Sequence, residues 1–528
     1  MRLPTHSPLA RHTLRRRIAL RITFTVYLVV SGYTMIHHEL SGDEVHSWNI
    51  VKGSATFPDL IHNSRYEGHP PGWYTLLWPL SRLTHDAAAI QVLHWAIASL
   101  VAFLIIFCSP LPFLTRILVP FGYYFLFEYA ILSRNYAIGV LLGCAICFLL
   151  SVNVRYGTSL YYILLFCMSN THLLAAVLAG SLHFCVFLRM RHRGRKSGAL
   201  VGHALLGVLV LLPSVYFIFP PADSALNIAS WRDKWSAQQV IAFGQAPLRS
   251  FLPVPAWWNH HFWNTQFLLE ARNSYPIFRL VNRLVVVLIL GSAFYVLWKH
   301  KASLMLFVTN LGLSFIIAAT TFPLITARYS GFIYIGFILA LWLYCAEQPC
   351  LTRGQAVLVH ALLVVQVVGG VFSASKDIRL PFANLFRVVE LTKEVPPDSR
   401  LVTDYWTMNA YVAFTDKPIY CVDMQRELSF ILWDRSLAEA LKKGARYSSG
   451  FHEIFRQGGP SEVYMVSLAS PQKLIRVDPE LDKDFRVVLI DKREGAIDKG
   501  SDLYLYRICP PETSALAYGP SPPRLVSR

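Results

Sequence analysis

The hydrophobic positions of this chain gather in long continuous runs up to about residue 373 and then give way to short runs. A helix needs about 20 apolar residues to cross a bilayer core of about 30 Å. Because the long runs are continuous rather than alternating, they predict membrane-spanning helices and not the strands of a barrel. The eleven expected spans lie at about 18–38, 87–107, 116–132, 136–153, 159–169, 172–189, 200–219, 278–298, 303–321, 328–346 and 355–373.

After the last expected span, residues 374–528 carry short β-branched runs separated by helical patterns. This alternation favours a separate α/β domain, and a segment of this length is large enough for one core. The tail from about residue 510 is rich in Pro and Ser and is expected to be disordered. The expected strands cover 400–404, 418–423, 462–466 and 485–490, and the expected helix covers 429–443. Domain 1–373 therefore precedes a second domain, 374–528.

The composition agrees with a membrane protein, since 54% of the residues are hydrophobic and 15% are charged, against about 25% charged in soluble domains. The net charge of +17 does not point to nucleic acid, because the basic residues gather in segments such as 11–21 and 189–196. The positive-inside rule places these segments in the cytoplasm. The N-terminus is then cytoplasmic and followed by an uncleaved first helix, while loops 39–86 and 220–277 and the C-terminal domain are extracytoplasmic. The expected location is the inner membrane of a bacterium.

Two of the nine cysteines, Cys421 and Cys509, lie in the C-terminal domain. They are candidates for a disulfide in an oxidising compartment. Two buried thiols are the alternative, because free cysteine also behaves as a small apolar residue.

Candidate chemistry gathers in the loop after the first span. Asp43 and Glu44 follow that span directly, and Arg65 and His69 lie further along in the same loop, beside a Pro-Pro-Gly-Trp-Tyr segment. Acids, histidines and aromatics together at a membrane surface suit the handling of carbohydrate and phosphate. An ordinary polar helix end is the alternative for the two acids alone.

Three further polar groups occur at the ends of later spans. They are Ser-Arg-Asn-Tyr with Arg134 and Tyr136, Asn-Thr-His with His172, and Ala-Arg-Tyr with Arg328 and Tyr329. Ionisable residues near membrane depth are costly and often mark a functional site. On the expected topology all three groups face the same side as Asp43, which predicts one shared site.

This constellation resembles the GT-C glycosyltransferases that use polyprenyl-phosphate sugars, among them the protein O-mannosyltransferases and the lipid A aminoarabinose transferases. The resemblance covers about residues 18–345 and implies transfer of a sugar from a polyprenyl-phosphate donor to a glycan, lipid or protein acceptor at the outer membrane face. Family members often carry an acid just before the Ala/Ser-Arg-x-Tyr element. This chain has Leu132 there, with Glu128 one helical turn earlier.

The resemblance also implies roles for the candidate residues. Asp43 is the expected general base, with Glu44 as the residue that orients it or contacts the acceptor. Arg328 and Arg134 are expected to hold the leaving phosphate, and His69 is expected to contact phosphate or sugar. A single base favours inversion at the anomeric carbon.

Several alternatives stay open at this point. A divalent metal ion could be held by Asp43, Glu44 and His69, or Asp43 could instead pair with Arg65. A transporter or flippase for a lipid-linked or anionic substrate is the second function, although no paired halves with broken helices are seen. An assembly protein whose C-terminal domain binds a partner is the third.

Overall fold

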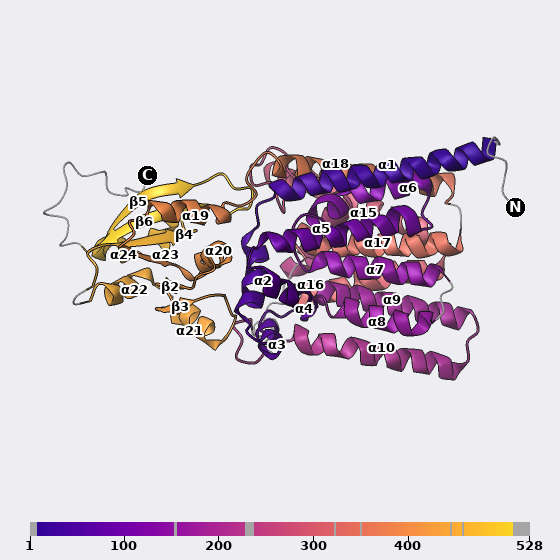
Figure 1. Ribbon diagram of the computed structural model, residues 1–528. Coiled ribbons are helices and arrows are strands. Elements are labelled where there is room, and N and C mark those ends of the chain that lie inside the picture. The colour runs from indigo at the N-terminus through magenta and orange to yellow at the C-terminus, as the bar shows by residue number, and fades with distance from the viewer. Residues whose placement is uncertain are drawn as a thin grey trace.

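A computed structural model of the chain describes residues 8–152, 156–226, 237–320, 324–348, 351–443, 446–456 and 459–510. Long helices form a bundle, and a six-stranded sheet domain lies beyond one end of it (Figure 1). Eight segments among these residues are long and apolar enough to span a membrane, which identifies a helical membrane protein. They are Leu14–His37 of α1 (Pro8–His37), α5 (Ala88–Phe103) with the π-helix η1 (Leu104–Cys108), α9 (Leu173–His192), α10 (Ser197–Ile218), α15 (Ile277–Leu297), α16 (Lys301–Thr320), α17 (Ala327–Glu347) and α18 (Arg353–Asp377).

Two expected spans appear as shorter apolar helices, α7 (Tyr136–Ser151) and α8 (Gly157–Ser169). The expectation of one continuous helix over 116–132 is wrong. That stretch is divided among α6 (Phe113–Leu118), the 3₁₀-helix η2 (Val119–Phe121) and the π-helix η3 (Tyr124–Glu128). Pro120 cannot donate to a helical ladder, and Gly122 is extended, so the segment changes direction between these turns.

Helix α17 lies at the centre of the bundle and is buried along almost its whole length. Close packing fixes its first turns, because Tyr124 and Tyr129 lie against Gly331 where a Cβ atom would collide with both. The Tyr129 hydroxyl also donates to the Arg328 carbonyl at 2.6 Å. The start of α17 is therefore a rigid support for the Arg328 side chain.

The loops at the domain end of the bundle are themselves helical. The first contains α2 (Gly42–Gly53), α3 (Phe57–Arg65) and α4 (Gly72–Leu83), and the second contains α12 (Ala237–Phe243), α13 (Ala246–Phe251) and α14 (Phe267–Ser274). Helix α2 begins with a capping box in which Glu44 accepts from the backbone N–H of Ser41. This cap places Asp43 and Glu44 in the first turn of α2.

The C-terminal domain is built on one mixed sheet with strand order β3-β2-β1-β4-β6-β5. β1 runs parallel to β2 and β4, whereas β3 and β6 pair antiparallel to β2 and β4. The strands are β1 (Arg400–Thr403), β2 (Ile419–Cys421), β3 (Arg426–Leu428), β4 (Val463–Ser467), β5 (Arg486–Arg493) and β6 (Leu503–Cys509). The helical segments are η4 (Leu385–Arg387), α19 (Val388–Leu391), η5 (Thr392–Glu394), α20 (Tyr405–Thr415), α21 (Arg435–Lys443), α22 (Tyr447–Ile454), α23 (Pro471–Val477) and α24 (Leu481–Asp484).

The four expected strands correspond to β1, β2, β4 and β5, while β3 and β6 were not anticipated. The expected helix 429–443 is wrong in its first half, because the chain leaves β3 at Leu428 and α21 begins only at Arg435. Cys421 and Cys509 are both free thiols. The tail expected to be disordered lies almost wholly outside the described residues, which end at 510.

Candidate functional site

Asp43 is the point where three distant segments of the chain meet. Its Oδ2 atom forms ion pairs with the Nη1 atoms of Arg134 and Arg328. The Asp43 side chain is 49% exposed, and the two guanidinium groups beside it hold its pKa well below the usual range. Asp43 is therefore a fixed anion between two cations.

The two arginines are held by their own elements and by aromatic rings. Arg134 lies just before α7, and Arg328 is the second residue of α17. The Arg328 guanidinium lies 5.1 Å from the ring centroid of Tyr329 and 5.9 Å from that of Trp263. Its Nε atom is buried without a hydrogen-bond partner among the described residues. Arg328 thus keeps a donor that a bound anion could use.

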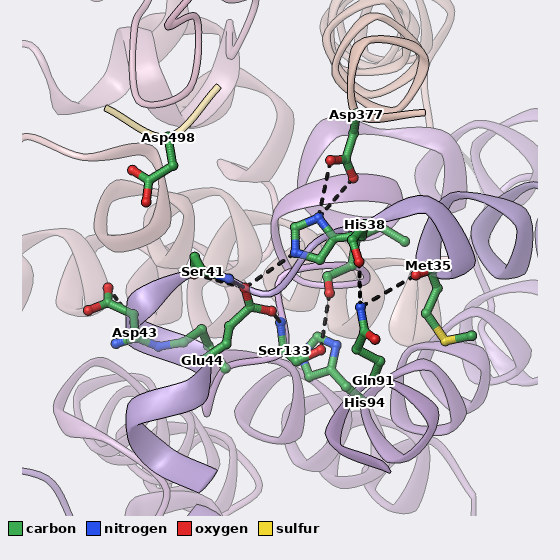
Figure 2. Close-up of polar contacts among 12 residues, drawn as sticks. Met35, His38, Ser41, Asp43, Glu44, Gln91, His94, Ser133, Asp377 and Asp498 are labelled. Atoms are coloured by element: carbon green, nitrogen blue, oxygen red, sulfur yellow. Dashed lines mark hydrogen bonds and ion pairs between the residues drawn. The ribbon is translucent and has the colours of Figure 1, made fainter. Parts of the chain in front are cut away.

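Glu44 has an environment quite different from that of Asp43, although the two residues are adjacent. It is fully buried and accepts from Ser41 N and Oγ at 2.8 Å and from Ser133 N at 2.5 Å. Figure 2 shows its carboxyl group directed into the bundle, whereas that of Asp43 points to the other side of α2. Glu44 is consequently suited to position the loop that carries Arg134, and not to contact an acceptor.

Sequence reasoning missed the group that pairs with Glu44. His38 places Nε2 3.3 Å from Glu44 and Nδ1 3.0 Å from Asp377 at the end of α18. Burial would lower the pKa of His38, but the two carboxylates raise it to about 10. A buried imidazolium thus links α1, α2 and α18 beneath the Asp43 cluster. In the sequence, His38 and Asp377 are polar residues near the ends of the first and last expected spans. Such residues are common at the boundaries of spans, so they gave no sign of a contact.

Two histidines present unpaired nitrogen atoms in the same region. His69 Nδ1 and His172 Nε2 are buried and have no hydrogen-bond partner among the described residues. Burial and the charge of Arg134 lower the pKa of His69 to about 4, and burial, with the charge of Arg134, lowers the pKa of His172. Both rings are therefore neutral and each can offer a hydrogen bond to a polar ligand.

Tyr136 and Tyr329 form an aromatic wall around these groups. The Tyr136 ring lies 4.9 Å from the His172 ring and 6.3 Å from the Tyr329 ring, measured between centroids. The Arg134 guanidinium lies 6.0 Å from the Tyr136 ring centroid. The structure therefore brings together the polar groups at the ends of the later spans, as the sequence predicted.

Arg65 does not pair with Asp43, so that alternative is wrong. Its guanidinium lies over the Tyr216 ring, 4.1 Å from the centroid, at the end of α10. In the same loop, His46 Nε2 lies 2.7 Å from Glu67 Oε2. Arg65 thus braces the loop against α10 rather than joining the two arginines at Asp43.

A further carboxyl group comes from the C-terminal domain. Asp498, in the loop between β5 and β6, points toward Asp43 (Figure 2). The loop is fixed by the Asp498 N–H, which donates to Phe382 O at 2.8 Å, and by the Ser501 hydroxyl, which donates to Asp498 Oδ2 at 2.6 Å. Burial raises the pKa of Asp498 to about 6. A lone acid in an interstrand loop gave no sequence signal.

The residues suggested for a metal do not fit one. Asp43 is paired with two cations, and both oxygens of Glu44 already accept from donors of the protein. Within the ranges that the structure describes, no group of three His, Cys, Asp or Glu side chains is arranged to hold a metal ion. Beside the carboxyl groups of Asp43 and Asp498, the site presents guanidinium groups and neutral imidazoles, which are hydrogen-bond donors suited to an anion.

No protein-family model matches the sequence, and neither does any curated protein.

Proposed function

We propose that the chain is an integral-membrane glycosyltransferase of the GT-C class, which moves a sugar from a polyprenyl-phosphate donor to an acceptor hydroxyl or amine. The observation that carries the proposal is the meeting of Arg134 and Arg328 on Asp43 at one end of an apolar bundle. A lipid-linked phosphate needs both an apolar surface for its chain and fixed cations for its headgroup.

The proposed orientation has eleven crossings, made by the eight long apolar segments, the shorter helices α7 and α8, and the divided segment from α6 to η3. The N-terminus lies in the cytoplasm of a bacterial inner membrane. Support comes from the far end of the bundle, where Arg189, Arg193 and His300 gather around Glu347. The N-terminal part of α1, whose sequence is rich in arginine, lies at that same end of the bundle (Figure 1). Positive groups favour the cytoplasmic face, so the site and the sheet domain would be extracytoplasmic.

In the proposed reaction the acceptor oxygen or nitrogen attacks the anomeric carbon and loses its proton to a carboxylate. The bond between that carbon and the phosphate oxygen breaks, and its electron pair stays with the polyprenyl phosphate. Arg134 and Arg328 would stabilise the charge that develops there. One attack of this kind inverts the anomeric centre.

Two carboxylates are candidates for the proton, Asp43 and Asp498. A general base works best with a pKa near the operating pH. The pKa of Asp43 is far lower, whereas that of Asp498 is raised to about 6. We therefore assign the role of general base, which accepts the proton, to Asp498. Asp43 instead holds the two arginines in place. This revises the expectation that Asp43 itself is the base.

The test compares wild type, Asp498→Asn and Asp43→Asn with a panel of radiolabelled polyprenyl-phosphate sugars in the presence of envelope extract, scoring release of polyprenyl phosphate. Asp498→Asn should lower kcat/KM by about 10²–10⁴-fold and abolish an acid limb near pH 6. Asp43→Asn should instead raise KM for the donor. Asp482→Asn, an exposed acid of the same domain, is the matched control.

A loss of the acid limb in Asp43→Asn but not in Asp498→Asn would return the base to Asp43. Donor binding without any release, in all extracts tried, would contradict the transferase and favour the flippase.

A further inference from the structure

A second cationic site lies away from Asp43. A cavity of about 530 Å³ opens between α12, α13, α14 and α15, and Arg272, Arg279 and Arg283 line it. The cavity lining contains no carboxylate, and its other polar groups are the neutral amides of Gln245, Asn273 and Asn282. The cavity is therefore strongly positive.

In the part of the chain that the structure describes, no carboxylate forms an ion pair with these arginines. None of the three arginines has an ion-pair or side-chain hydrogen-bond partner among the described residues. A fourth, Arg249, follows the lining residue Leu248 and has its Nε and Nη1 atoms buried without a partner. Burial and the charge of Arg272 lower the pKa of Arg249 to about 10, and Glu270 offsets part of that effect. Guanidinium groups gathered in this way repel one another unless an anion lies between them.

The position of the cavity shows what kind of anion would reach it. Arg279 and Arg283 lie one turn apart in the first two turns of α15, a candidate membrane span. The neighbouring Leu280 and Leu284 are each 55% exposed, and Val287 and Leu288 continue this exposed apolar surface along the helix. A cationic cavity thus borders an apolar surface that faces the membrane.

We propose that this cavity binds the phosphate headgroup of an anionic membrane lipid, whose acyl chains lie along α15. Arginine forks match phosphate oxygens, and basic pockets between spans are a recurrent form of lipid recognition. The site is separated from Asp43 by α13, where the Ser250 hydroxyl donates to the Ser330 carbonyl at 2.7 Å. A bound headgroup would hold α13 against the start of α17, and the proposal does not depend on the glycosyltransferase assignment.

The test is native mass spectrometry of the delipidated protein in detergent, titrated with phosphatidylglycerol or with phosphatidylcholine. Wild type should bind phosphatidylglycerol more tightly than phosphatidylcholine. The double variant Arg279→Gln/Arg283→Gln should lose at least about tenfold in affinity for phosphatidylglycerol. The control Arg191→Gln/Arg195→Gln removes two exposed charges from the other end of the bundle and should bind as wild type does.

Thermal melting of each variant without lipid tests whether the fold is retained. If the double variant unfolds, the single variant Arg272→Gln is used in its place. Equal affinity of the double variant and wild type would overturn the proposal, as would equal binding of the two lipids. Competition by inorganic phosphate at concentrations no higher than those of the lipid would overturn the lipid assignment and identify a soluble anion instead.

Discussion

Asp43 and Glu44 show how one turn of helix can separate two roles. The side chains of successive helical residues do not share a face, so Asp43 reaches the arginines while Glu44 turns into the bundle. The sequence predicted a role in the site for both acids. It did not predict that the carboxylate of Glu44 accepts hydrogen bonds from buried donors of the protein. The contacts of Glu44 are with Ser133, which is distant in the sequence, and with His38, which lies at the end of the first expected span.

The buried imidazolium of His38 leads to a pH-dependent prediction. Its pKa is about 10 in the folded protein, against about 6.5 when unfolded. The stability it contributes is complete below pH 6.5 and is lost as the pH rises through 10. His38→Gln leaves two buried carboxylates unpaired, so at pH 6 it should cost about 3–5 kcal/mol. The melting temperature, followed by intrinsic fluorescence in detergent, measures this.

The difference in melting temperature between wild type and His38→Gln should shrink steadily between pH 6.5 and 10. His192→Gln, an exposed histidine at the end of α9, controls for general effects of pH. A difference that stays constant over this range would show that the imidazole is neutral when folded.

At the scale of elements, α2 connects the bundle to the sheet domain. Asn49 donates from Nδ2 to the Asn409 carbonyl of α20 at 2.8 Å, and Lys52 lies 2.7 Å from Asp416 at the end of that helix. The same α2 carries Asp43 in its first turn. The C-terminal domain therefore restrains the element that positions the site, and its β5–β6 loop adds Asp498 to it.

Asn49→Ala tests this contact, because it leaves the buried side-chain oxygen Oδ1 of Asn409 without its donor, which is Asn49 Nδ2 at 3.2 Å. An unsatisfied buried group costs about 1–3 kcal/mol, so amide exchange in α20 should accelerate by about 5- to 150-fold. Hydrogen–deuterium exchange with mass spectrometry resolves α20 from α22, which should not change. Lys417→Gln, an exposed change just after α20, should leave exchange in α20 as in wild type. Acceleration throughout the sheet would instead indicate general loss of the fold.

The elements that the sequence predicted well are those whose own residues form a long, continuous apolar run. The spans at 200–219 and 328–346 correspond closely to α10 and α17. The stretch 116–132 misled because its apolar residues satisfy a helical pattern while Pro120 and Gly122 interrupt the backbone. Strand β6 was missed although Leu503–Cys509 is an apolar and aromatic run, because its role depends on pairing with both β4 and β5.

For the whole molecule, the sequence predicted that Asp43, Arg134 and Arg328 share one end of the bundle, since topology alone fixes the end at which each loop lies. It could not predict Asp498, because the contact between the β5–β6 loop and the bundle is set by tertiary packing. His260 and His261 hold this loop through the carbonyls of Gly495 and Ile497. Only the folded domain brings such residues to the site.

The proposed orientation in the membrane predicts which positions of the chain an impermeant reagent can reach from outside the cell. His62, Lys483 and Arg195 are all exposed, the first two at the site end and in the sheet domain, the third near the opposite end. Single cysteines at these positions, in a background with the native cysteines replaced, should react differently with an impermeant maleimide applied to intact spheroplasts. His62→Cys and Lys483→Cys should be labelled from outside, and Arg195→Cys only after lysis. Because positive residues at the Arg195 end favour the cytoplasm, labelling of Arg195→Cys in intact cells would reverse the orientation. Labelling of only one of the other two would separate the sheet domain from the site and so contradict the role given to Asp498.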